Sequence, residues 1–189
     1  MISDVRARIC YDMYHMAGEY KFDVSSGDKA MLFQEAANIL LKQEFRLIDF
    51  DIQRPWGFFL SVDESQADRF ISAFYSGIDL KDIDSSMSLR PKFLGLAPNK
   101  RLSWQYHHRR AEIWRCLAGE FELVTSEGDE EDQTQRVEPG QIVSMPRGMR
   151  HRGVGLGEWA LVAEIWQHTD PANPSNEDDI VRVQDDFGR

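Results

Sequence analysis

From Ser88 onward, the sequence is a series of short apolar runs that are interrupted by turn-forming residues. The runs lie within the stretches PKFLGLAPNK, IWRCLAGEFELVTSEGDE, QIVSMPRGM and EWALVAEIW, and Gly and Pro recur in and between them. Short strands with frequent Gly and Pro are typical of an antiparallel sandwich or barrel. The acidic stretch 127–132 interrupts this pattern and is predicted to be the tip of a hairpin. We therefore expect an all-β fold over this part of the chain.

Two helical segments precede the β-rich region. The first is expected to begin near Asp28 as its N-cap, because apolar residues follow at three- and four-residue spacings from Met31 to Leu40. The second is expected after Asp63, where DESQADRFISAFY combines early acids with apolar residues at helical spacing. The sequence thus predicts an N-terminal helical extension over 1–53 and a barrel domain over 54–189, with a helical insertion near 60–87.

Length and composition agree with one domain and its extension. The chain has 189 residues, of which 42% are hydrophobic and 29% charged, the balance of an ordinary globular protein. No apolar run approaches the roughly 20 residues that span a bilayer, and MISDVRARIC lacks the apolar core of a signal peptide. We expect a cytoplasmic protein with no membrane partner, in which Cys10 and Cys116 are reduced thiols.

The charge is negative overall but unevenly distributed. A formal net charge of −10 argues against binding to nucleic acid, because phosphate backbones are bound by basic surfaces. One segment departs from this balance, since a single acid, Glu112, lies among the basic residues Arg90, Lys92, Lys100, Arg101, Arg109, Arg110 and Arg115. This pattern suits a small anionic ligand, and a solvated basic strand edge is an equally good interpretation.

Two groups of polar and glycine residues in the β-rich region have regular spacings. The first is Gln105, His107, four residues, Glu112, six residues and Gly119. The second is Gly140, five residues, Pro146, Arg147, Gly148, two residues and His151. Both spacings resemble the two motifs of the cupin family. The resemblance implies a cupin fold, which is a double-stranded β-helix or jelly-roll-like antiparallel barrel.

The residues of these motifs can bind a metal ion. Side chains two apart on a strand share a face, so Gln105 and His107 are both expected to point into the barrel, where Glu112 and His151 join them. Two imidazoles, a carboxylate and an amide oxygen suit one divalent ion, for which we expect zinc, with manganese, iron or cobalt as alternatives. A barrel that binds no metal and satisfies its histidines by hydrogen bonds is the alternative interpretation.

Within the cupins, the chain resembles the type II phosphomannose isomerase domain in its stand-alone form. The segments that carry this resemblance are RPWGFF at 54–59, LSWQYHHRRAEIW at 102–114, PRGMRHR at 146–152 and EDDIVRVQDDFGR at 177–189. Nothing in the chain resembles the nucleotidyltransferase domain of the bifunctional members. Ile165 and Trp166 stand where the family has a Gln after Glu164, and about thirty residues between Phe59 and Ser88 replace a short hairpin.

The resemblance implies interconversion of an aldose phosphate and a ketose phosphate, in the first instance mannose 6-phosphate and fructose 6-phosphate. Arg182, Lys92 and Glu164 are the predicted catalytic residues, and Arg110 and Arg152 are predicted to bind substrate. Solvated cations or structural salt bridges are the alternative roles. The tail from Glu177 is expected to fold over the barrel mouth and act on the substrate, so that its removal would abolish turnover and leave the metal in place.

Other functions remain open from the sequence. The chemically nearest is an isomerase of another sugar, a pentose or heptose. A cupin oxygenase would use Fe²⁺, although Gln105 in place of a histidine disfavours this. A sugar-binding cupin without turnover belongs to a different functional class. We expect a small sugar phosphate as the ligand and a homodimer as the assembly.

Overall fold

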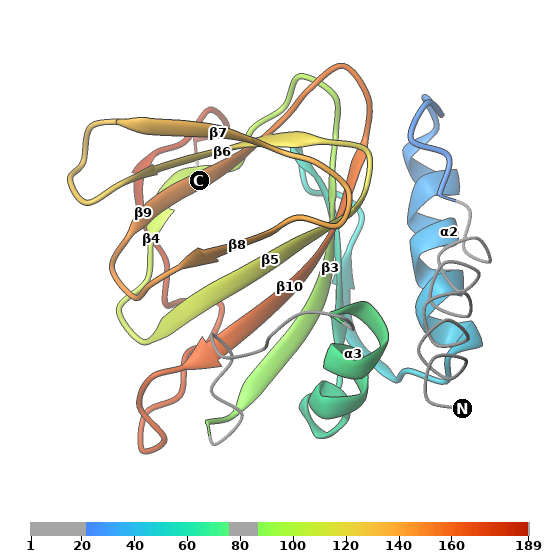
Figure 1. Cartoon of the computed structure of the whole chain (residues 1–189), viewed down its shortest axis with the longest axis horizontal. Helices are drawn as coiled ribbons and strands as arrows, with labels where there is room; N and C mark the ends of the chain where they lie inside the picture. The colour runs from blue at the N-terminus through green and yellow to red at the C-terminus, as the bar shows by residue number, and fades with distance from the viewer. Residues whose placement is uncertain (1–21, 76–86, 189) are drawn as a thin grey trace, which may run out of the picture.

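The computed structural model describes residues 22–75 and 87–188, whose strands form two antiparallel sheets (Figure 1). The six-stranded sheet has the order β1-β2-β3-β10-β5-β8, and the five-stranded sheet has the order β11-β4-β9-β6-β7. The strands are β1 Leu47–Asp51, β2 Gly57–Val62, β3 Leu89–Leu96, β4 Trp104–Tyr106, β5 Arg110–Ala118, β6 Phe121–Ser126, β7 Gln133–Val137, β8 Ile142–Met145, β9 Arg150–Gly155, β10 Ala160–His168 and β11 Val181–Gln184. The predicted all-β, antiparallel architecture is confirmed.

The two predicted helices lie where the sequence placed them. Helix α2, Lys29–Lys42, begins after Asp28, whose carboxylate accepts hydrogen bonds from the backbone N–H groups of Ala30 and Met31. The short 3₁₀ helix η1, Glu64–Gln66, and helix α3, Ala67–Phe74, follow Asp63. Both α-helices pack on the outer face of the six-stranded sheet, to the right of and below it in Figure 1.

Alternation along the strands divides the apolar residues between two cores. Phe58, Phe93 and Ile113 face outward and pack with α2 and α3. Their sequence neighbours Phe59 and Leu94 face inward and contribute to the core between the sheets. Successive side chains on a strand point to opposite faces, so every second residue of β3, β5 and β10 enters the interior of the sandwich.

The same alternation brings charged residues into that interior. Lys92 is two residues before Leu94 on β3, and Glu164 is its cross-strand partner on β10. Glu112 is two residues before Trp114 on β5. All three are almost completely buried, with 3%, 4% and 2% of their surface exposed for Lys92, Glu164 and Glu112. Buried charges need partners, so these positions mark a polar part of the interior.

The first strand of the six-stranded sheet was not predicted. Strand β1 lies within the 1–53 segment that the sequence assigns to a helical extension, and it pairs antiparallel with β2. The sheet therefore begins before Arg54, and β2 occupies the start of the region described as an insertion near 60–87. The division into two segments stays a prediction, because part of each segment, together with Cys10, lies outside the described residues.

Two turns are set by their local sequence, and the first confirms a prediction. The acidic stretch 127–132 connects β6 to β7 as a hairpin tip. Gly119 connects β5 to β6 with φ of +66°, and a Cβ atom there would lie 2.0 Å from the Trp159 carbonyl oxygen. Only glycine fits this turn without strain or displacement of Trp159.

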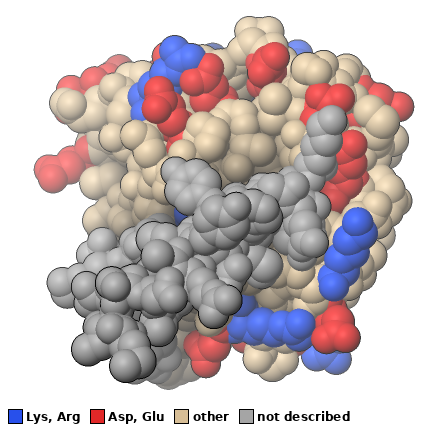
Figure 2. All heavy atoms as spheres, turned by 45° about the vertical axis from the view of Figure 1, so that its right-hand side comes forward, with Lys and Arg blue, Asp and Glu red and all other residues tan. Residues whose placement is uncertain are grey.

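The surface charges are mixed on one face, and the described helices are short. Acidic and basic side chains are intermixed on the face seen in Figure 2, which views the molecule from the side of α2. In the described part of the chain, no helix has the length and apolar character needed to cross a bilayer.

Candidate metal centre and cavity

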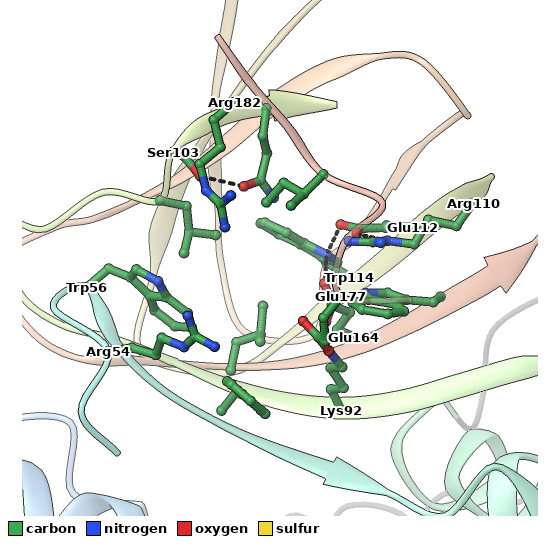
Figure 3. Close-up of a pocket in the computed structure, with 16 residues that line it drawn as sticks. Arg54, Trp56, Lys92, Ser103, Arg110, Glu112, Trp114, Glu164, Glu177 and Arg182 are labelled. Atoms are coloured by element: carbon green, nitrogen blue, oxygen red, sulfur yellow. Dashed lines mark hydrogen bonds and ion pairs between the residues drawn. The ribbon is translucent and has the colours of Figure 1, made fainter. Parts of the chain in front are cut away.

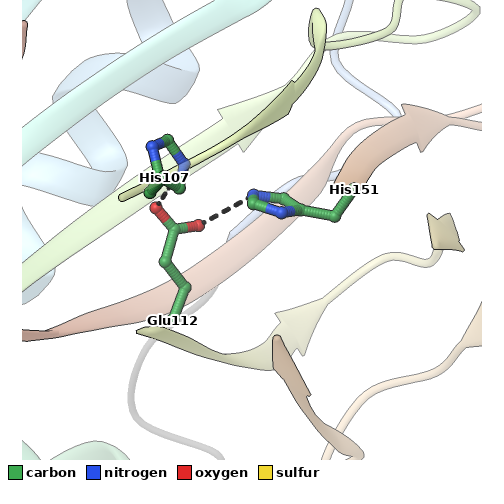
Figure 4. A group of neighbouring side chains, drawn as sticks. All are labelled: His107, Glu112 and His151. Carbon is green, nitrogen blue, oxygen red and sulfur yellow. Dashed lines mark ion pairs between the residues drawn. The ribbon is translucent and has the colours of Figure 1, made fainter. Parts of the chain in front are cut away.

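His107, Glu112 and His151 form a buried cluster between the two sheets (Figure 4). His107 follows β4, Glu112 lies on β5 and His151 lies on β9. Nε2 of His107 lies 3.1 Å from one carboxylate oxygen of Glu112, and Nε2 of His151 lies 3.2 Å from the other. The ligand atoms of the three residues lie within 4.8 Å of one another. This places three of the four predicted metal ligands together.

The hydrogen bonds of the two imidazoles leave their Nε2 atoms as acceptors. Nδ1 of His107 lies 2.5 Å from the Asp179 carbonyl oxygen, and Nδ1 of His151 lies 3.0 Å from that of Met149. A carbonyl oxygen can only accept, so each Nδ1 carries a proton. Burial lowers the pKa of His107 despite the neighbouring Glu112, which favours the neutral ring.

A cation fits the space that these acceptors share. In the neutral rings, each Nε2 lone pair faces an oxygen lone pair of Glu112, and Nε2 of His151 is buried without a hydrogen-bond donor. Acceptors at such short separation repel one another unless a cation lies between them. Two imidazole rings whose Nδ1 atoms contact backbone carbonyls, together with one carboxylate, are a donor set that suits zinc and other borderline divalent ions.

Gln105 lies beside this cluster. It is the direct cross-strand partner of His151, which places the two Cβ atoms on one face at roughly 5 Å. Its Oε1 accepts a hydrogen bond of 2.6 Å from the Ser103 hydroxyl, and its side chain lines the same cavity as Glu112. Gln105 is thus positioned next to the ligands, as the sequence predicted, and its role as the fourth ligand stays a prediction.

Arg110 is bound to the cluster itself. Its Nε donates to Glu112 Oε1 at 2.7 Å, and its Nη2 lies 3.2 Å from His107 Nε2. Burial acts to raise the pKa of Glu112, but His107 and Arg110 outweigh it and hold that pKa well below its usual range. The guanidinium also stacks 3.5 Å from the Trp166 ring. Arg110 therefore contacts the Glu112 carboxylate and helps to keep it ionised, and its predicted contact with substrate stays a prediction.

The cluster opens into a cavity between the sheets (Figure 3). Acidic and basic groups lie at the end near Glu112, whereas Arg54 and Arg182 lie toward the other end. The residues that line the cavity are Arg54, Trp56, Phe59, Lys92, Leu94, Leu102, Ser103, Gln105, Arg110, Glu112, Trp114, Glu164, Trp166, Glu177, Ile180 and Arg182. The predicted catalytic residues Lys92, Glu164 and Arg182 are thus brought into one cavity with Glu112.

Glu164 has the environment of a proton carrier. Burial, and after it the negative charge of Glu112, raises the pKa of Glu164 to about 8, against the opposing effect of Lys92. The indole N–H of Trp114 lies between the two carboxylates, 2.9 Å from Glu164 Oε1 and 3.2 Å from Glu112 Oε2. A carboxyl group with a pKa near neutrality can both accept and return a proton.

Lys92 is held on three sides. Its Nζ lies 2.5 Å from Glu177 Oε1 and 3.6 Å from the centre of the Trp166 ring, and Glu164 is opposite it on the neighbouring strand. Burial lowers the pKa of Lys92, although Glu164 and Glu177 oppose this effect. Lys92 is thus a buried cation with partners, and the interpretation as a solvated cation is wrong.

The basic residues around the first motif mainly bind the C-terminal tail. Lys92 contacts Glu177, and Arg101 makes two hydrogen bonds of 2.5 and 2.8 Å to Asp186. Arg109 contacts the tail through the side chains of Asn173 and Asn176 and the Pro174 carbonyl. The basic segment and the acidic tail are therefore complementary parts of the fold, which neither sequence interpretation anticipated.

Arg152 lies away from the cavity. It follows His151 on β9, so alternation turns the two side chains to opposite faces. Its Nη1 lies 3.0 Å from Glu131, and its Nη2 lies 3.4 Å from the Gln184 carbonyl oxygen. The structure does not bring Arg152 to the residues that line the cavity, although the sequence predicted it to bind substrate.

Several residues of the cavity or the cluster were not singled out from the sequence as site residues. Arg54 and the tail acids Glu177 and Asp179 lie within segments already noted for their family resemblance. Trp114 is two residues from Glu112, so strand alternation could have placed it on the inner face. Their contacts join positions far apart in the sequence, and local patterns contain no information about such pairs.

Replacement of His107 by Ala should remove most of the bound metal, because it deletes one of the nitrogen ligands. His108→Ala is the matched control, since His108 is the next residue and is exposed. Metal content after dialysis, measured by plasma mass spectrometry, should fall below stoichiometric in His107→Ala and stay near one ion per chain in His108→Ala. Full occupancy in His107→Ala would contradict the assignment.

Known proteins with similar sequences match most of this chain. Residues 92–165 match the family model described as a cupin domain. The xanthan biosynthesis protein XanB of Xanthomonas campestris is 30% identical over 139 residues, and the alginate biosynthesis protein AlgA of Pseudomonas aeruginosa is 29% identical over 140 residues. These matches span 73% and 74% of this chain but only 23% of each relative.

A solved structure of recombinant oxalate oxidase with glycolate is also similar. It has a TM-score of 0.41 and 22% identity, over 50% of this chain and 46% of the oxidase chain. The antiparallel two-sheet architecture and the match of residues 92–165 to the cupin domain model together support an all-β, cupin-like fold for the described part of this chain.

Proposed function

We propose that this protein is a metal-dependent sugar-phosphate isomerase that interconverts an aldose and a ketose, in the first instance mannose 6-phosphate and fructose 6-phosphate. The observation that carries the proposal is that Glu112 of the histidine cluster, the buried pair Lys92 and Glu164, and three arginines line one cavity. The resemblance of four segments to type II phosphomannose isomerases supports it. The two relatives named for xanthan and alginate biosynthesis also support a carbohydrate substrate.

The metal ion would be held by His107, Glu112 and His151, with Gln105 beside them. When bound, a divalent ion supplies Lewis-acid stabilisation of the negative charge that develops on the sugar oxygens. The protein keeps these ligands in place through the Asp179 and Met149 carbonyls and through Arg110.

Glu164 is the residue we assign to proton transfer. Its carboxylate takes the proton from C2 of the aldose, the C1–C2 bond becomes the double bond of an enediolate, and the proton of the C2 hydroxyl passes to the carbonyl oxygen at C1. Return of the carbon proton from Glu164 to C1 then forms the carbonyl group at C2 and gives the ketose. A pKa of about 8 suits both directions of this transfer near neutral pH.

We assign Lys92 to keeping Glu164 in its ionised form for this step. The ammonium group opposes the pKa elevation of Glu164 and so favours its ionised, proton-accepting form. Its contacts with Glu177 and the face of Trp166 fix the ammonium at the same end of the cavity.

Arg54 and Arg182 are assigned to the phosphate. Figure 3 places both at the end of the cavity away from Glu164, with Ser103 near Arg182. A guanidinium offers a planar set of donors that matches phosphate oxygens. A substrate with its phosphate there would extend its carbon chain toward the metal cluster. The homodimer and the cytoplasmic location stay predictions.

A panel of sugars tests this proposal against its alternatives. We expect turnover of mannose 6-phosphate in D₂O to yield product with deuterium at C1 or C2, detected by NMR. Faster turnover of a pentose or heptose would change the assigned sugar. Saturable binding without any product would favour a non-catalytic sugar-binding cupin and contradict the isomerase.

A further inference from the structure

We propose that Asp179 is a positioning residue for the metal centre, and that binding of the C-terminal tail and binding of the metal are energetically coupled. The inference rests on the proposed metal site but not on the proposed reaction. Its basis is that the carbonyl group which orients His107 belongs to the tail, 72 residues away in the sequence.

The neutral imidazole of His107 carries one N–H proton, and an acceptor lies near each of its two nitrogens. The Asp179 carbonyl oxygen lies 2.5 Å from Nδ1, and Oε1 of Glu112 lies 3.1 Å from Nε2. A proton on Nδ1 leaves the Nε2 lone pair directed at the cluster, which is the tautomer that binds a metal. A proton on Nε2 would instead be donated to Glu112 and would block that lone pair. Contact of Nδ1 with the Asp179 carbonyl, together with the Arg110 Nη2 donor 3.2 Å from Nε2, therefore selects the metal-binding tautomer.

His151 provides an internal comparison. Its Nδ1 is bound to the carbonyl of Met149, only two residues earlier in the same segment. The orientation of His151 is thus set by its own turn and strand and is independent of the tail. Of the two histidines, His107 alone takes its orienting carbonyl from the tail.

The side chain of Asp179 fixes the position of that carbonyl. Oδ1 accepts from the backbone N–H of His108 at 3.0 Å, and Oδ2 accepts from the backbone N–H of Arg109 at 3.0 Å and the Ser175 hydroxyl at 2.7 Å. The residue is 5% exposed. These bonds join the tail to the segment that follows His107, so the carbonyl and the imidazole are positioned by one structural unit.

The same tail carries residues assigned to the cavity. Glu177 binds Lys92, and Arg182 on β11 is the cross-strand partner of Gln105. Asp179 lies between these two positions in the chain.

Binding of the tail and binding of the metal affect each other equally. If tail binding raises metal affinity by some factor, metal binding stabilises the bound tail by the same factor. Metal loading would thus help to assemble the substrate-binding end of the cavity. Deletion of the tail would also weaken metal binding, contrary to the expectation from the sequence.

The test compares Asp179→Asn with Asp178→Asn in the full-length chain. The asparagine keeps the shape of Asp179, but its NH₂ group replaces one of the two oxygens that accept hydrogen bonds from His108, Arg109 and Ser175. Asp178 is the control because it is the exposed neighbour of Asp179. Zinc affinity, measured by competition with a chromophoric chelator, should be about 10- to 100-fold weaker in Asp179→Asn and unchanged in Asp178→Asn. Equal affinity in both variants would overturn the inference.

Proteolysis of the tail provides the second readout. Zinc should slow cleavage after residue 170 in the parent protein and in Asp178→Asn, and this protection should be lost in Asp179→Asn. Equal protection in all three proteins would overturn the coupling. If Asp179→Asn does not give a folded circular dichroism spectrum, Ser175→Ala replaces it. That variant removes one donor to Asp179 and should weaken zinc binding, and unchanged binding would overturn the inference.

These readouts separate this inference from the proposed reaction. A parent protein that binds zinc but converts no sugar phosphate would contradict the isomerase, and the zinc affinities of the variants would still decide the role of Asp179. A parent protein that binds no divalent ion would overturn both the metal centre and the role of Asp179.

Discussion

Glu164→Gln is expected to lower kcat for mannose 6-phosphate by about 10²- to 10⁴-fold, the usual contribution of a positioned general base. The amide keeps the size of the side chain and can still accept from the Trp114 indole N–H, but it cannot take up a proton from carbon. Metal content should therefore stay at the parent level while turnover falls. Parallel assays of kcat and bound metal check both expectations.

The control for this prediction is Glu158→Gln, which makes the same chemical change at an exposed position. Its kcat should be unchanged. The parent enzyme should gain activity as pH rises and Glu164 loses its proton, and the residual activity of Glu164→Gln should lack that dependence. A Glu164→Gln protein with parental kcat would assign proton transfer to another group.

Arg182→Ala should lower kcat/KM for phosphorylated sugars by about 30- to several-thousand-fold, because loss of a partner to a charged group costs about 2–5 kcal/mol. If Arg182 contacts phosphate, unphosphorylated analogues should lose much less. An equal loss for both classes would place it at the reacting carbons instead. Kinetics on paired phosphorylated and free sugars distinguish these outcomes.

Arg54→Ala tests the second arginine assigned to the phosphate, and Arg136→Ala is the control. Arg54 lines the cavity, so its removal should also discriminate against phosphorylated substrates. Arg136 lies on β7 and pairs with Glu120, away from the cavity-lining residues, so its removal should leave kcat/KM unchanged. Parental kinetics in Arg182→Ala and Arg54→Ala would remove the phosphate site from the account.

The parts of the fold that depend on local chemistry could be predicted from the sequence. Asp28 and Asp63 lie at the starts of the predicted helices because a carboxylate there satisfies backbone N–H groups. The clustering of His107, Glu112 and His151 followed from motif spacing. Strand alternation also turns Arg152 to the face opposite its neighbour His151, and its contact with substrate stays a prediction.

The contacts that complete the site could not be predicted in this way. The ion pair of Lys92 with Glu177 joins residues 85 positions apart, and the bond of His107 to Asp179 joins residues 72 apart. Periodicity reports which face of a strand a residue occupies but not which distant segment covers that face. Strand β1 was missed for a related reason, because its sequence LIDFD is short and its burial pattern is mostly exposed.

A metal-dependent isomerase is tested most simply by the rate of conversion of mannose 6-phosphate to fructose 6-phosphate before and after metal removal. Chelation should abolish turnover, and adding back a stoichiometric divalent ion should restore it. Fructose 6-phosphate formed at an unchanged rate by metal-free protein would rule out a metal-dependent reaction.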